Sequence, residues 1–272
     1  MVNVFNPEKL SQVSDLSPDY LQADPFPHIV MDNVIDIQVL QAALDAFPQA
    51  HALDFYRYDN ELEKKLAFDQ VSLLPVPLST LLHTLNMPLF LRFLEELTGI
   101  EGLIPDPYYR GGGIHQIEMG GKLDVHIDFN KYTKLNLYRR LNVIIYLNQE
   151  WQEEYGGHLE LWRGHKEGET HVLDECVSRI LPLFNRMVVF STSDHSYHGH
   201  PDPVTCPKDR SRKSLATYYY TQHCPEGENA EPHSTIFVRR PTDAHDPYLE
   251  ELRKKRNKGR LASNVTSHLV AE

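Results

Sequence analysis

The sequence contains few of the residues that build covalent or fibrous frameworks. It has only 3 cysteines (Cys176, Cys206 and Cys224) among 272 residues, and no two of them form a CxxC motif. Disulfide scaffolds are typical of much shorter secreted chains, so we expect reduced cysteines and no cysteine-rich zinc site. Glycine and proline, with 14 and 18 residues, are too sparse for a collagen-like or low-complexity chain.

Long apolar runs and a leader pattern are also missing. No stretch approaches the roughly 20 apolar residues that cross a bilayer, and Met1 to Leu10 lack the basic-then-apolar order of a secretory signal. We therefore predict no membrane partner and a cytoplasmic location. The formal net charge of −11 repels phosphate backbones, so nucleic acid is not an expected partner. The basic run from Arg253 to Arg260 is interpreted as a solvated helix end followed by a loose tail.

The remaining composition, 41% hydrophobic and 24% charged, is that of a globular protein with one substantial core. We expect a single domain over residues 1–225. Within it, a helical N-terminal section at about 25–107 would support a β-rich core at about 108–225. Residues 226–272 are expected to form a C-terminal helix and tail.

Local patterns support this division. The first 24 residues are polar and are expected to be irregular, and a short strand is expected at Phe26–Met31. Apolar residues at helical spacing predict one helix capped by Asp36 and another that ends before Gly99. Further along, short β-rich runs separated by turn residues predict a sandwich or barrel. These runs are Gly113–Met119, Lys122–Ile127, Leu141–Leu147, His158–Leu161, Met187–Ser191 and Ser214–Thr221.

A His-x-Asp motif supplies two candidate metal ligands. On a strand, residues two apart project from the same face, so His126 and Asp128 would point into one space while Ile127 packs on the other side. One imidazole and one carboxylate suit a divalent first-row metal, and one more histidine would complete a facial triad. The motif alone is a weak signal in a chain with 15 histidines.

The downstream sequence supplies the missing parts. His198 lies 72 residues after His126, although His200 has the same strand parity and competes for the same role. Arg212 and Ser214 follow on another predicted strand, where they share a face. A guanidinium beside a hydroxyl is suited to a carboxylate, because its donors match two oxygens.

In this order, His-x-Asp, distal His and Arg-x-Ser resemble the 2-oxoglutarate/Fe(II)-dependent dioxygenase superfamily, specifically its prolyl-4-hydroxylase-like branch. Three further segments are similar to that branch. They are Arg140–Asn148 followed by Trp151, the turn Gly156–Leu159, and Pro182–Arg186. The resemblance implies a mainly β fold with flanking α-helices, built on a double-stranded β-helix or jelly-roll core.

The resemblance also implies roles for individual residues. His126, Asp128 and His198 would bind Fe(II), since the family pattern H-G-x-P selects His198 over His200. Arg212, Ser214 and Tyr146 would bind the distal carboxylate of 2-oxoglutarate. Gln116 would lie near the iron-chelating end of this cosubstrate. His158, His165 and His171 are expected to face solvent. Arg139 and Arg140 are expected to be structural, with the alternative that one of them faces the substrate.

The implied activity is hydroxylation of an unactivated C–H bond with Fe(II), 2-oxoglutarate and O2, stimulated by ascorbate. Succinate and CO2 would be released, with no separate protein acid or base. Related halogenases lack the carboxylate ligand, so Asp128 favours hydroxylation. The substrate would be an amino acid, a peptidyl residue or a small metabolite, and the oligomeric state is left open. Two alternatives are a metal-dependent hydrolase and a non-catalytic jelly-roll binding module.

Overall fold

The computed structural model describes residues 4–228 and 231–258. Within them, five helices precede residue 100 and one follows the β core. The helices are α1 (Pro7–Ser11), α2 (Val13–Gln22), α3 (Ile37–Asp45), α4 (Val76–Leu85), α5 (Pro88–Thr98) and α6 (Pro247–Asn257), with short 3-10 turns η1 (Val71–Leu73) and η2 (Glu153–Tyr155). In this part of the chain, no helix has the length and apolar character to span a bilayer. The cytoplasmic location stays a prediction.

Fourteen strands make up the β structure of the described residues. They are β1 (His28–Asp32), β2 (Tyr56–Asp59), β3 (Glu63–Phe68), β4 (Ile104–Pro105), β5 (Gly113–Ile117), β6 (Lys122–Ile127), β7 (Lys131–Tyr132), β8 (Leu137–Tyr146), β9 (Leu159–Glu167), β10 (Thr170–Ile180), β11 (Arg186–Ser191), β12 (Tyr197–His200), β13 (Arg212–Thr221) and β14 (Ile236–Phe237).

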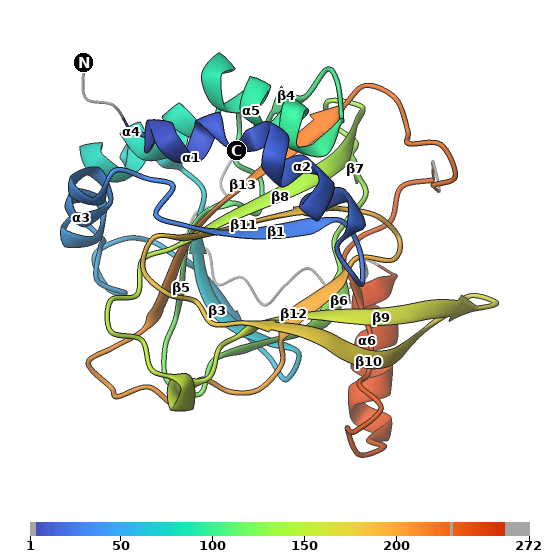
Figure 1. Cartoon of the computed structure of the whole chain (residues 1–272). Helices are drawn as coiled ribbons and strands as arrows, with labels where there is room; N and C mark the ends of the chain where they lie inside the picture. The colour runs from blue at the N-terminus through green and yellow to red at the C-terminus, as the bar shows by residue number, and fades with distance from the viewer. Residues whose placement is uncertain (1–3, 229–230, 259–272) are drawn as a thin grey trace.

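The strands pair in the order β1-β11-β8-β13-β5-β3-β6-β12-β9-β10, and the named pairs are antiparallel. Figure 1 shows how this sheet curls back on itself. An upper layer of β1, β11, β8 and β13 faces a lower layer of β6, β12, β9 and β10, and β5 and β3 connect the two. This arrangement confirms the predicted jelly-roll core with flanking helices.

The largest hydrophobic cluster joins the upper layer to the helices α1–α5 that cover it. Leu40, Leu82, Phe90 and Leu94 from the helices pack in one cluster with Tyr219 from β13, and each is 0% exposed. Two predicted helix ends are confirmed. The Asp36 side chain accepts hydrogen bonds from the first turn of α3, and Gly99 ends α5 with a positive φ of 69°.

The expectation of an irregular opening stretch was wrong. Residues 7–22 form α1 and α2, and the apolar side chains Val13, Leu16 and Tyr20 recur on one face of α2. Tyr20 is 0% exposed, and its hydroxyl lies 2.7 Å from Ser191 Oγ at the end of β11. Burial of one aromatic side chain against the sheet therefore fixes a segment whose average composition is polar.

The interpretation of the basic run was also wrong for two of its residues. Arg253 is only 7% exposed, and its Nη2 lies 3.1 Å from Asp124 Oδ2 on β6. Arg256 forms an ion pair with Glu63 on β3. These pairs attach α6 to the lower layer (Figure 1). The remainder of the run, from residue 259 onward, lies outside the described residues.

Candidate metal and cosubstrate site

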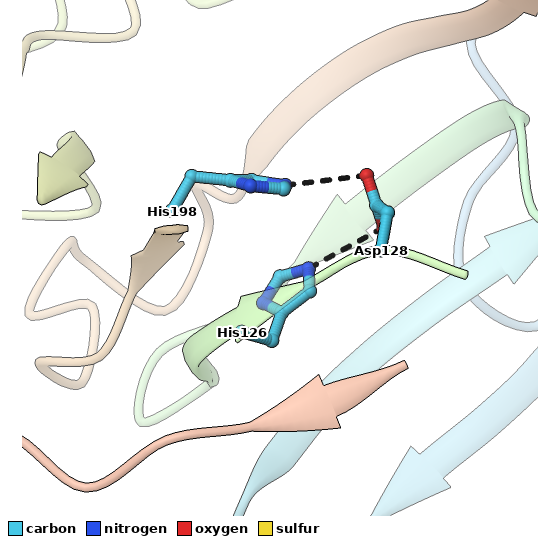
Figure 2. A group of neighbouring side chains, drawn as sticks. All are labelled: His126, Asp128 and His198. Carbon is cyan, nitrogen blue, oxygen red and sulfur yellow. Dashed lines mark ion pairs between the residues drawn. The ribbon is translucent and has the colours of Figure 1, made fainter. Parts of the chain in front are cut away.

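Two paired strands of the lower layer bring the three predicted metal ligands together. His126 is near the end of β6, Asp128 follows that strand, and His198 lies on β12 directly opposite His126. His126 Nε2 is 3.6 Å from Asp128 Oδ1, and His198 Nε2 is 3.4 Å from Asp128 Oδ2 (Figure 2). One candidate ligand atom from each of the three buried residues lies within 4.8 Å of the other two.

Hydrogen bonds fix both imidazoles in the orientation that a metal ligand needs. His126 Nδ1 lies 2.9 Å from the carbonyl oxygen of Asp124, and His198 Nδ1 lies 2.8 Å from that of Ser196. When each Nδ1 donates to its carbonyl, each Nε2 carries a lone pair directed at the other ligands. Burial and the neighbouring His126 lower the pKa of His198 to about 4, which keeps this imidazole neutral at physiological pH. The donor set therefore fits Fe(II).

The carboxylate of Asp128 is held by two residues of β8. Arg139 Nη2 donates to Oδ2 at 2.8 Å, and Asn142 Nδ2 donates to the same oxygen at 3.4 Å. Burial alone would raise the pKa of Asp128, but Arg139 and then His198 lower it well below its usual value. The guanidinium also lies 3.5 Å above the centre of the Tyr218 ring. Asp128 is thus ionised and oriented before any metal binds.

No sequence pattern selects Arg139 for this role. A register shift in the pairing of β13 with β8 places Arg139 opposite Tyr220 and leaves Arg140 as the extra residue. Counting every second residue back from Tyr146 along β8 would therefore select Arg140 instead of Arg139. Asn142 has the same parity as Tyr146, so this second contact to Asp128 was detectable by counting alone.

Tyr146, Arg212 and Ser214 come together on neighbouring strands, as predicted. Ser214 on β13 pairs with Tyr146 on β8, and Arg212 Nη2 donates to the Tyr146 hydroxyl at 3.3 Å. Arg212 Nε donates to the carbonyl oxygen of Gly157 at 2.7 Å. At Gly157 a Cβ would lie only 2.9 Å from Arg212 Cδ, so only glycine leaves room for this approach.

Arg212 is a buried cation without an anion. It is 4% exposed, burial lowers its pKa, and it forms no ion pair with any described carboxylate. A guanidinium in this state is costly unless an anion completes it. The two carboxylates of 2-oxoglutarate are anions of the required kind. The residues present therefore fit the cosubstrate.

The structure does not bring Gln116 to this site. Gln116 on β5 pairs with Lys213, and its Nε2 donates to Ser211 Oγ at 3.0 Å on the face turned away from the metal ligands. The preceding residue, His115, lines the cavity beside His126 instead. The prediction came from the resemblance, which implies a polar side chain on the strand before His126 but does not fix the face of the strand on which that side chain lies. We assign Gln116 no cosubstrate contact.

His200, His158 and His165 lie outside the ligand cluster. His200 is buried, but the pairing of β12 with β6 shifts between His198 and His200, so His200 is opposite Leu123 and outside the ligand cluster. His158 was expected to face solvent and is instead 5% exposed, with Nε2 2.9 Å from Glu153 Oε1. His165 is exposed, as predicted.

A cavity of about 330 Å³ opens at the metal ligands. His126 and Asp128 lie in its wall together with aromatic side chains from four segments. These aromatic residues are Tyr56, Tyr58, Phe129, Tyr218 and Phe237. The Phe237 ring is centred 5.7 Å from the His126 ring, so β14 forms part of the cavity wall. Arg110 also lines the cavity, where its guanidinium lies 5.4 Å from the Phe129 ring centre.

A jelly roll that holds two imidazoles and one carboxylate on one side of a prospective metal defines the class of non-haem Fe(II) oxygenases. Residues 112–220 match the sequence model of the 2OG-Fe(II) oxygenase superfamily. This match lies within the predicted β core and confirms the resemblance to that superfamily that the sequence indicated. Fe(II) and 2-oxoglutarate are the metal and cosubstrate that define the superfamily.

Known proteins give the same fold assignment. Over 208 residues the chain is 26% identical to mouse (Mus musculus) Prolyl 3-hydroxylase OGFOD1, an alignment that covers 74% of this chain and 34% of the relative. The chain thus spans about a third of the length of that relative. A Trichoplax adhaerens prolyl hydroxylase, solved with a peptide fragment of hypoxia inducible factor, has a TM-score of 0.52 at 15% identity, covering 79% of this chain and 92% of that one. A Pseudomonas putida prolyl-4-hydroxylase has a TM-score of 0.50 at 15% identity, covering 77% and 99%.

Proposed function

We propose that this chain hydroxylates a prolyl residue within a polypeptide, using Fe(II), 2-oxoglutarate and O2 and releasing succinate and CO2. One observation carries the proposal more than any other. The two free imidazole nitrogens and the ionised Asp128 converge in the same β framework that buries Arg212 without an anion. A metal and a dicarboxylate together satisfy both features, whereas either one alone leaves the other unexplained.

The protein residues would divide the work by position. His126, Asp128 and His198 would hold Fe(II), while Arg212, with Tyr146 and Ser214, would bind the distal carboxylate of 2-oxoglutarate. Together with O2, bound Fe(II) and 2-oxoglutarate would supply oxidative decarboxylation coupled to insertion of one oxygen atom into a C–H bond. Arg139 would keep one oxygen of Asp128 engaged, so that the other is free to bind the metal.

A prolyl substrate is supported by the wall of the cavity and by the relatives. Phe129, Tyr218 and Phe237 offer apolar faces against which a pyrrolidine ring packs. The relative OGFOD1 is named as a prolyl 3-hydroxylase, and the Trichoplax enzyme was solved with a peptide. The cavity of about 330 Å³ opens to the surface, which suits a side chain presented by a longer polypeptide.

The two alternatives fit less well. A metal-dependent hydrolase needs no buried guanidinium, and it leaves Arg212 without a role. A binding module without catalysis needs neither an ionised Asp128 nor two imidazoles oriented through Nδ1. Both alternatives therefore leave energetically costly features unexplained.

The test uses the purified full chain with Fe(II), ascorbate, 2-oxoglutarate and a library of proline-containing peptides. We expect succinate formation together with a mass increase of one oxygen atom on a peptide, and neither product with Asp128→Ala. Matched peptides with alanine in place of proline should not be modified. Oxygen incorporation into a free metabolite but into no peptide would contradict the polypeptide proposal. Succinate formation by Asp128→Ala at the wild-type rate would contradict the metal site.

A further inference from the structure

A second and larger cavity lies outside the metal site. It measures about 920 Å³, compared with about 330 Å³ at the metal ligands, and runs between β10, β14 and α6. In Figure 1, α6 crosses β9 and β10 in the view and extends below the lower layer, and the lining of the cavity places α6 next to β10. We call this space the outer groove. Phe237 borders both the outer groove and the metal cavity, so the two spaces adjoin at this residue.

The rim of the outer groove carries uncompensated positive charge. Four of its cations are exposed and take part in no ion pair with a described residue: Lys166, Arg239, Lys254 and Lys258. Three carboxylates also border the groove. Asp194 lies 3.0 Å from His233, Glu250 lies 2.9 Å from His245, and Glu169 forms no ion pair with a described residue, so the four unpaired cations outnumber the carboxylates. On a chain of net charge −11, this local excess of positive charge favours an anionic partner.

The floor of the outer groove favours a polypeptide over a nucleic acid. Val172, Leu173, Ile236 and Val238 line it with apolar surface, which a phosphate backbone would not use. β10 is the last strand in the sheet order, so among the described residues one of its edges has no partner strand. The consecutive residues Thr170–Leu173 all border the groove, which therefore opens onto the edge of the strand. An added extended segment would find backbone partners at such an edge.

We propose that the outer groove binds an extended acidic segment of the polypeptide substrate, next to the residue that is hydroxylated. This proposal rests on the proposed function, since it assigns a binding site to the same substrate. The segment would contribute carboxylates to Lys166, Arg239, Lys254 and Lys258 and apolar side chains to the floor. It would leave the groove past Phe237, where the metal cavity begins. Substrate choice would then depend on acidic sequence flanking the target residue.

Binding is measured by fluorescence anisotropy, which needs no turnover. The probe is a fluorescein-labelled octapeptide of alternating glutamate and valine, titrated with the full chain at low and high salt. The double variant Lys166→Glu/Lys254→Glu should weaken binding by about tenfold or more, because two rim attractions become repulsions. Lys208→Glu, an exposed lysine outside the groove, should bind like the wild type. Circular dichroism should confirm that both variants are folded.

Three results would overturn the proposal. They are equal affinity in the double variant, equal affinity for a lysine–valine octapeptide, and equal or tighter binding of an oligothymidylate. If the proposed function holds, a substrate peptide extended by glutamate and valine should also have a KM about tenfold below that of the same peptide extended by serine. Failure of all peptide turnover would contradict the proposed function. The anisotropy result would still show whether the outer groove binds an acidic segment.

Discussion

Arg212 is the residue whose surroundings most clearly indicate an anionic ligand. Its guanidinium is 4% exposed and reaches a carbonyl oxygen and a phenol hydroxyl, both of them uncharged. Neighbouring Arg210 has the same strand parity but forms an exposed pair with Glu150 at 3.4 Å. The two arginines therefore provide a matched comparison between a buried cation and a solvated one.

We expect Arg212→Ala to weaken 2-oxoglutarate binding by about a hundredfold or more, because breaking a buried charge pair costs roughly 3–5 kcal/mol. Arg212→Lys should recover part of this loss, since an ammonium lacks the planar fork. Metal affinity should change little. Calorimetric titration of 2-oxoglutarate into Zn(II)-loaded protein measures the effect, with Arg210→Ala as the control. Wild-type affinity in Arg212→Ala would remove the carboxylate clamp from the site.

A second prediction separates the two histidines of β12. His198→Ala should abolish metal retention because two protein ligands hold a divalent ion weakly, while His200→Ala should retain one metal per chain. Metal analysis after gel filtration gives the stoichiometry of each variant. The opposite pattern would move the ligand by two residues and would contradict the geometry of Figure 2.

Local periodicity determined how much of the site was predictable. His126 and Asp128 could be paired from the sequence because an i, i+2 spacing on a strand fixes a shared face. Arg139 could not be placed, because a register shift in the pairing of β13 with β8 changes the count. Gln116 pairs with Lys213 and lies on the other face of its strand, which its position along the chain did not reveal. Sequence parity is reliable along one uninterrupted strand and fails wherever the ladder is irregular.

At the scale of elements, the C-terminal segment shows what local patterns do not predict. α6 lies in the segment that was expected to form a helix and tail beyond residue 225, but β14 also pairs with β6 and places Phe237 opposite His126. Arg253 then joins α6 to Asp124, which Lys122 also contacts at 2.7 Å. Contacts of this kind join residues more than a hundred positions apart, and no local sequence pattern predicts them. The strands and capped helices, by contrast, depend on neighbours within a few residues and were found.

We expect Arg253→Met to lower the free energy of unfolding by about 2–3 kcal/mol, since it leaves the buried Asp124 with Lys122 as its single charged partner. Lys255→Met on the same helix should cost about 0.5 kcal/mol or less, because Lys255 makes only an exposed pair with Glu251. Urea unfolding measures both. Adding Asp124→Asn to Arg253→Met should recover part of the loss. Equal losses in the two single variants would show that the buried pair contributes nothing.

At the scale of the whole molecule, the site draws on both layers of the jelly roll. The metal ligands come from β6 and β12 in the lower layer, and Arg139, Tyr146 and Arg212 come from β8 and β13 in the upper layer. No unfolded chain holds these groups together. Binding of metal and cosubstrate must therefore stabilise the global fold rather than a local loop.

A fourth prediction follows from this linkage. At about a hundred times its dissociation constant, a ligand adds roughly 2.7 kcal/mol of stability, which raises the Tm of a chain of this size by about 5–10 °C. We expect Zn(II) with 2-oxoglutarate to produce such a shift in the wild type and none in Asp128→Ala. Removal of the metal by a chelator should reverse it. A thermal scan in which both proteins respond equally would contradict binding at the triad.

The pairing of β14 with β6 has a consequence for how the protein is made. His126 leaves the ribosome long before Phe237 and α6, which complete the wall of its cavity. About 130 residues separate His126 from the end of α6, so translation at roughly 5–20 residues per second leaves the nascent site open on one side for on the order of ten seconds. During that interval the ligand face of β6 is exposed to surrounding metal ions and chaperones. An iron ion that arrives before α6 is in place encounters an incomplete cavity. Selective binding of iron therefore follows the synthesis of this segment.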